Sequence, residues 1–139
     1  RIKDSGGLVW FSPELAVTYW PRESISAVAK QFYSTGVWRG DLSRRDLRRV
    51  SLRYWAPPTL TLVLITSVLL AVIISPLALI AIAPYFLLLT GVAVTAKNLR
   101  IPGRLALLLV IPTIHFSWGL GFLRGFVFRA GATVDRSRV

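Results

Sequence analysis

Two long uncharged stretches, residues 56–74 and 77–96, most constrain what this chain can fold into. A run of about 20 apolar residues is the length that crosses a bilayer as an α-helix. A proline pair opens the first stretch, where a missing N–H costs little, and Ser75-Pro76 separates the two. The sequence therefore predicts a tight hairpin of two transmembrane helices, with a kink at Pro84 in the second.

A third apolar run, residues 105–125, follows a basic loop over residues 97–104. The loop and the arginine-rich segment before the first run are expected on the cytoplasmic side, because positively charged loops stay there. If the third run crosses, four arginines end outside, against that rule: Arg124, Arg129, Arg136 and Arg138. If it dips back or lies along the interface, they stay inside. Close helix packing is favoured by three small residues in this run, Gly119, Gly121 and Gly125.

His115 is the only histidine, and it lies in the middle of the third run. An ionisable side chain at membrane depth is a candidate for a functional polar site. The other interpretation is a neutral imidazole that is hydrogen-bonded to a neighbouring helix. The residue pattern leaves both open.

The charge balance points to a membrane partner. The 139 residues carry 17 Lys and Arg against 6 Asp and Glu, a net charge of +11, and 54% of them are hydrophobic. Such an excess suits nucleic acid or an anionic lipid surface. Because no acidic residue lies between Asp46 and Asp135 and this region is mostly apolar, we expect anionic membrane lipid as the partner and no nucleic acid. The chain has no cysteine, which excludes disulfides and thiolate metal sites.

Residues 24–55 are expected to form two amphipathic helices at the membrane interface. Ser24 suits an N-cap, and the apolar residues behind it recur at helical spacing. Gly36 predicts a bend, since glycine weakens a helix by about 1 kcal/mol relative to alanine. Asp41 or Ser43 is expected to cap a second, basic helix whose arginines contact lipid phosphates or steer a phosphorylated substrate. Those arginines are Arg44, Arg45, Arg48, Arg49 and Arg53.

The stretch from Gln31 to Arg39 carries the most specific side chains. Gln31, Thr35 and Trp38 recur at i, i+4 and i+7, so they share one helix face. An indole can lie on the C–H face of a sugar ring, and the guanidinium of Arg39 can bind a phosphate through two parallel hydrogen bonds. The pattern suits either a site for a phosphorylated sugar beside a membrane or an interfacial helix with an aromatic anchor.

Residues 1–23 look like one edge of a larger soluble domain. Residues 1–5 can be the last turns of a helix that Gly6-Gly7 stops, and residues 8–11 and 15–19 are short β-favouring runs. Two short strands and the end of a helix cannot make a stable domain alone. We therefore expect them to pair with a sheet from a longer polypeptide.

The order of these segments resembles the membrane-bound family 2 glycosyltransferases, most closely bacterial enzymes of the succinoglycan-synthase type. Residues 1–6 look like the family's Arg-x-x-x-x-Gly helix, and the tryptophan-rich runs at residues 10–13 and 17–22 follow in the family's order. The family's Gln-x-x-Arg-Trp signature is present as a variant, with the arginine after the tryptophan. The residues that carry this variant are Gln31, Gly36, Trp38 and Arg39.

The resemblance implies a mainly α-helical membrane fold that follows a GT-A α/β domain. It favours a third crossing, because the residues from His115 to Gly125 look like those of family members with three transmembrane helices. The implied parts are the GT-A edge (1–23), interfacial helices (24–55), a transmembrane region (56–128, with spans near 56–74, 77–96 and 105–125) and a basic tail (129–139).

In function, the resemblance implies inverting transfer of a sugar from a nucleotide-diphosphate donor to a lipid-linked or glycan acceptor. The setting would be envelope or exopolysaccharide synthesis at the bacterial plasma membrane, with the N-terminal part cytoplasmic. The general base and the acidic motif for Mg or Mn would precede Arg1, so this stretch alone is expected to be inactive and to hold no metal.

Three side chains receive roles from the resemblance. Trp38 is expected to stack on the acceptor sugar, while Gln31 and Arg39 contact the leaving diphosphate. The alternative is a non-catalytic membrane anchor or assembly subunit that binds anionic lipid and a partner protein.

Overall fold

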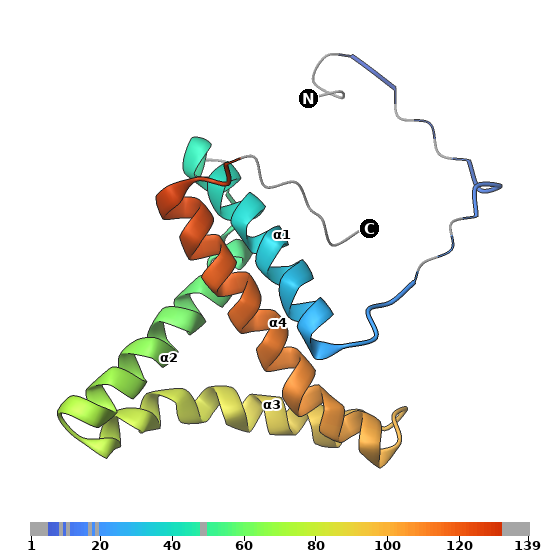
Figure 1. Ribbon diagram of the computed structural model, residues 1–139. Helices are drawn as coiled ribbons and strands as arrows, with labels where there is room; N and C mark the ends of the chain where they lie inside the picture. The colour runs from blue at the N-terminus through green and yellow to red at the C-terminus, as the bar shows by residue number, and fades with distance from the viewer. Residues whose placement is uncertain are drawn as a thin grey trace.

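The computed structural model describes residues 6–8, 10, 12–16, 18, 20–47 and 50–131. All regular structure in this part of the chain is helical (Figure 1). Three helical stretches, residues 52–73, 76–95 and 101–128, are long and apolar enough to cross a membrane. The elements are α1 (Ile25–Arg45), η2 (Leu52–Tyr54), α2 (Ala56–Ile73), η3 (Pro76–Ile82), α3 (Ala83–Thr95) and α4 (Ile101–Phe128), where η denotes a 3₁₀ helix.

The two short strands expected near the beginning of the chain are wrong wherever the structure describes them. Residues 8, 10, 15, 16 and 18 belong to no strand, and Leu8 and Trp10 are 97% and 90% exposed. A strand needs a backbone partner, and no described segment pairs with these residues. The remaining residues of both runs, and the helix end expected over residues 1–5, lie outside the described residues.

One continuous helix, α1, replaces most of the two that were expected between residues 24 and 55. Ser24 caps α1 as predicted, because its Oγ accepts a hydrogen bond from the Ala27 N–H at 3.2 Å. The helix continues through Gly36 without a break and ends at Arg45. The new N-cap predicted at Asp41 or Ser43 is therefore wrong, and both residues are buried inside α1.

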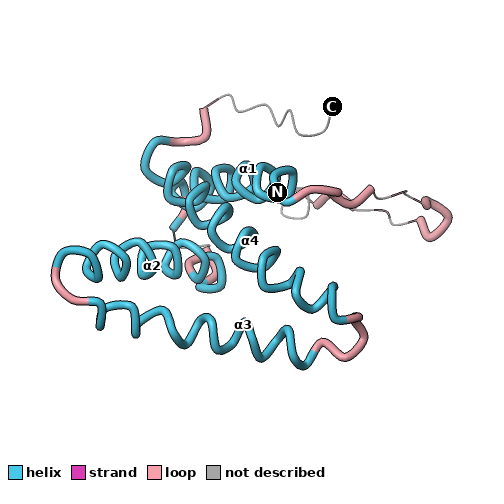
Figure 2. The backbone as a smooth tube through the Cα atoms, turned by 60° about the horizontal axis from the view of Figure 1, so that its bottom comes forward, coloured by secondary structure: helices cyan, strands magenta, loops and turns pink. Residues whose placement is uncertain are grey.

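Helix α1 packs directly against the backbone of α4 through four glycines, two on each helix. This contact stabilises α1 and explains why the helix continues through Gly36. The two helices run side by side in the same direction (Figure 1), and Figure 2 shows the same pair from another side. Small residues four apart allow helix backbones to approach this closely, which confirms the packing role predicted for the glycines of α4. A Cβ on any of the four would collide with a carbonyl oxygen of the facing helix: Gly36 with Trp118, Gly40 with Phe122, Gly121 with Tyr33 and Gly125 with Val37.

The predicted hairpin forms between α2 and the continuous stretch of η3 and α3. It turns at Ile74 and Ser75, and the Ser75 Oγ accepts a hydrogen bond from the Leu77 N–H at 3.3 Å at the start of η3. At Pro84 the chain changes from 3₁₀ to α winding, in place of the kink expected within one α-helix. Pro84 lies in the first turn of α3, where its missing N–H leaves no helical hydrogen bond unmade.

The three apolar stretches form the sides of a triangle (Figure 1). α2 leads away from α1, η3 and α3 form the next side, and α4 returns to the beginning of α2. We call the place where the C-terminal ends of α1 and α4 meet the first turns of α2 the junction corner. The basic corner is the loop of residues 96–100 between α3 and α4, and the uncharged corner is residues 74–76 between α2 and η3.

Candidate functional site

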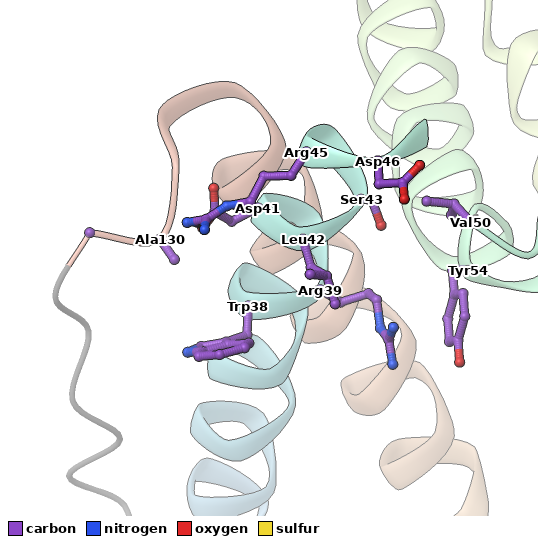
Figure 3. A pocket seen from close by; sticks show the side chains of 11 residues that line it. Trp38, Arg39, Asp41, Leu42, Ser43, Arg45, Asp46, Val50, Tyr54 and Ala130 are labelled. Carbon is purple, nitrogen blue, oxygen red and sulfur yellow. Dashed lines mark hydrogen bonds and ion pairs between the residues drawn. The ribbon is translucent and has the colours of Figure 1, made fainter. Parts of the chain in front are cut away.

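An open pocket with a volume of about 710 Å³ lies beside the last turns of α1, at the junction corner (Figure 3). The end of α1, the segment before α2 and the first residues after α4 form its walls. This places it directly before the first apolar helix. Its lining residues are Trp38, Arg39, Asp41, Leu42, Ser43, Arg45, Asp46, Val50, Tyr54, Ala130 and Gly131.

Arg39 and Tyr54 form the basic side of the pocket. The guanidinium carbon of Arg39 lies 4.1 Å from the centre of the Tyr54 ring, a distance typical of cation–π contact. Arg53 is 5.0 Å from the same ring centre, and its Nη2 donates a hydrogen bond to the Tyr54 Oη at 3.1 Å. Within the described part of the chain, Arg39 forms no ion pair with a carboxylate, so its charge is available to an anionic ligand.

The other charged side chains at the end of α1 are engaged within the protein. Asp41, only 7% exposed, accepts a hydrogen bond from the Arg45 Nη2 at 2.6 Å. The Arg44 Nη1 donates to the Val127 carbonyl oxygen at 3.2 Å, which satisfies one of the free carbonyls at the end of α4. Arg44 and Arg45 therefore have protein contacts besides the lipid contacts predicted for them.

Ser43 is 1% exposed, and its Oγ has no hydrogen-bond partner among the described residues. Arg48 and Arg49, also predicted to contact lipid or phosphate, lie outside the described residues. The second basic helix predicted here is replaced by the short segment η2, which precedes α2.

The residues predicted to bind a phosphorylated sugar do not all lie at one site in the structure. Trp38 lines the pocket and is 65% exposed, but it points to a different side of α1 from Arg39 (Figure 3). Gln31 does not line the pocket, because it lies two helical turns earlier, about 10 Å along the axis. Its Oε1 accepts a hydrogen bond from the Arg22 Nε at 3.3 Å. The structure thus keeps Trp38 and Arg39 together and places Gln31 apart.

His115 lies far from this pocket, where α4 faces α3. Its Nδ1 is 3.2 Å from the Tyr85 Oη, within hydrogen-bonding distance. The Tyr85 ring also packs edge-on against Phe86 and Phe116, with ring centres 5.4 and 6.4 Å away. Of the two interpretations that the sequence left open, the structure shows the hydrogen bond to a neighbouring helix.

We expect Tyr85→Phe to lower the free energy of unfolding by about 1 kcal/mol, because it removes a hydrogen bond between two helices in apolar surroundings. The measurement is a double-mutant cycle with His115→Phe, on protein purified in detergent and unfolded by denaturant. If the two residues interact, their effects will not add, and the coupling energy should be about 0.5–1.5 kcal/mol. Fully additive effects would show that the hydrogen bond contributes nothing to stability.

Sequence reasoning missed the role of Tyr54. The residue lies in η2, where it contacts the Arg39 guanidinium of α1. One signal could have found it, namely the Arg53-Tyr54-Trp55 run just before the apolar stretch. Aromatic residues next to a membrane span often mark the headgroup level, where anionic groups are found.

No family model, curated protein or solved structure matches this chain. Among the residues that the structure describes, no group of three or more His, Cys, Asp or Glu side chains could hold a metal ion. What the pocket offers is a guanidinium for an anion and an exposed indole for a flat or ring-shaped apolar surface.

Proposed function

We propose that this chain is the membrane-side, C-terminal part of an inverting glycosyltransferase of the family 2 type. It would serve transfer of a sugar from a nucleotide-diphosphate donor to a lipid-linked or glycan acceptor at the cytoplasmic face of the bacterial plasma membrane. The observation that carries the proposal is the pocket, which combines the exposed Trp38 with the Arg39 charge directly before the first apolar helix. The segment order that resembles this family supports the same function.

Each side chain of the pocket has a distinct role in this proposal. Trp38 stacks on the acceptor sugar, and Arg39 neutralises the diphosphate as it leaves. Tyr54 is a positioning residue, because its ring holds the Arg39 guanidinium in place. Gln31 lies two turns before the pocket, so it can contact only a more distant part of an elongated nucleotide-sugar.

The general base and the acidic residues for Mg or Mn belong, in this proposal, to an α/β domain of the parent protein. The base would deprotonate the acceptor hydroxyl. The alternative function, a membrane anchor or assembly subunit that binds anionic lipid and a partner protein, requires neither Gln31 nor Trp38 to be retained. Substitution of Trp38 therefore distinguishes the two functions, because only sugar transfer depends on its side chain.

Trp38→Ala, made in the full-length protein, should reduce sugar transfer by about tenfold, which corresponds to about 1.4 kcal/mol of transition-state stabilisation. The loss follows because alanine removes the surface on which the acceptor sugar stacks. The measurement is transfer from a radiolabelled nucleotide-sugar into the lipid and glycan fractions of native membranes. The amount of each variant in the membrane fraction is quantified in parallel.

Phe128→Ala is the matched control, since Phe128 is also an exposed aromatic residue, at 78%, and does not line the pocket. It should transfer sugar at the wild-type rate. Equal transfer by the two variants would remove the acceptor role of Trp38. If the wild-type protein transfers no sugar from any donor in a panel of nucleotide-sugars, the anchor function would replace the proposed one.

A further inference from the structure

The triangle formed by α2, η3–α3 and α4 restricts how the chain can cross a membrane. The 18 residues of α2 span about 27 Å, which is close to the thickness of a hydrocarbon core. A chain that crosses three times in succession begins on one side and ends on the other. The start of α2 and the end of α4 would then lie about a membrane thickness apart.

The structure instead places the start of α2 and the end of α4 in contact at the junction corner. Rings from the segment before α2 pack on rings of α4, and a glycine of α4 lies against the first turns of α2. The Arg44 side chain of α1 also reaches the last turn of α4. The ring pairs are Trp55–Phe122, Trp55–Phe126 and Tyr54–Trp118, with centres 5.2, 5.4 and 6.4 Å apart, and the glycine is Gly119 against Pro57 and Thr61.

We propose that this chain crosses the membrane twice, with the end of α4 on the same side as α1 and the start of α2. Two ends that touch cannot lie on opposite faces of the bilayer. Of the three sides of the triangle, two cross and one runs along the membrane. The inference rests on packing and charge, and it does not depend on the proposed transferase activity.

Charge identifies α4 as the side that does not cross. The uncharged corner holds no ionisable residue, so it can be the corner that reaches the far side. The other two corners are basic and are expected together at the headgroup level of one side, by the positive-inside rule. α4 joins these two corners, so it lies along the interface. The basic residues are Lys97, Arg100 and Arg104 at one corner and Arg39, Arg53, Arg124 and Arg129 at the other.

The contacts at both ends of α4 agree with this placement. The Arg104 guanidinium donates hydrogen bonds to the carbonyl oxygens of Val94, Lys97 and Leu99. Because a charged side chain belongs at the membrane surface, these bonds keep the basic corner there. Helix α1 lies on the C-terminal half of α4 through the glycine contacts. Because α1 is the more polar helix, it shields that half of α4 from water while the rest of its surface faces lipid.

Cysteine accessibility tests the inference directly, since the chain contains no cysteine of its own. Single cysteines are introduced in the full-length protein at three exposed positions, as Glu23→Cys, Asn98→Cys and Arg124→Cys, with Ile74→Cys at the uncharged corner. A membrane-impermeant maleimide is then applied to intact cells and to inside-out vesicles. We expect the first three cysteines to be labelled from one side and the cysteine at position 74 from the other.

The side from which the Arg124→Cys variant is labelled decides the outcome. Labelling together with Ile74→Cys would mean three crossings and would overturn the inference. Labelling of Ile74→Cys from the same side as Asn98→Cys would overturn it as well, because the hairpin would then not cross. If Arg124→Cys does not accumulate, Phe128→Cys replaces it, since Phe128 is 78% exposed at the end of α4.

Discussion

Replacing Gly40 by alanine should push α1 away from α4 and destabilise the protein by about 1–3 kcal/mol, the usual range for overpacking. The added Cβ would meet the carbonyl oxygen of Phe122 and lie 2.8 Å from the Phe126 nitrogen. Both are backbone atoms, so they cannot rotate away as a side chain would. Trp38 and Arg39 directly precede Gly40, and the pocket should therefore be distorted by the same change.

Gly91→Ala provides the matched control because it makes the same substitution in α3, at a site where a Cβ meets nothing within 4 Å. Alanine is favoured over glycine in a helix by about 1 kcal/mol, so this variant should be as stable as the wild type or more stable. The measurement is the thermal unfolding midpoint of both variants, purified in the same detergent. Equal midpoints would show that Gly40 does not hold a tight helix contact.

The membrane helices could be predicted from the sequence because length and lack of charge are local properties. The apolar stretches, the turn at Ser75 and the Ser24 cap all follow from residues close to one another in the chain. Gly36 shows where such reasoning fails. Its local effect is to weaken the helix, but its contact with Trp118, 82 positions further along the chain, outweighs that effect. The sequence shows that Gly36 and Gly40 are four residues apart, but it does not show which helix they pack against.

The candidate site was only partly predictable for a similar reason. Trp38 and Arg39 are neighbours in sequence, and both line the pocket. Gln31 shares a helix face with Trp38, yet a shared face says nothing about the axial distance, which is about 10 Å for seven residues. Tyr54 contacts Arg39 although the two residues are 15 positions apart in the chain. No local sequence pattern specifies a contact of this kind.

Phe122→Ala is expected to be the most destabilising truncation at the junction corner, by about 3–5 kcal/mol, as is typical of buried phenylalanines. The Phe122 side chain is 0% exposed. Its ring centre lies 5.2 Å from that of Trp55, 5.4 Å from that of Trp118 and 6.0 Å from that of Phe126. Alanine would leave a cavity among three aromatic rings that belong to two different helical stretches, and rigid rings cannot collapse to fill it.

Phe128→Ala is the control, since Phe128 ends the same helix but is 78% exposed, and its loss should change stability by less than about 0.5 kcal/mol. Denaturant unfolding in detergent gives both values, and the tryptophan emission of Phe122→Ala should shift to longer wavelength as Trp55 and Trp118 become hydrated. If the two variants are equally stable, the aromatic cluster does not hold the start of α2 on α4. The shared membrane depth of these two segments would then lose its packing support, even though the basic residues at both ends of α4 would still favour one side.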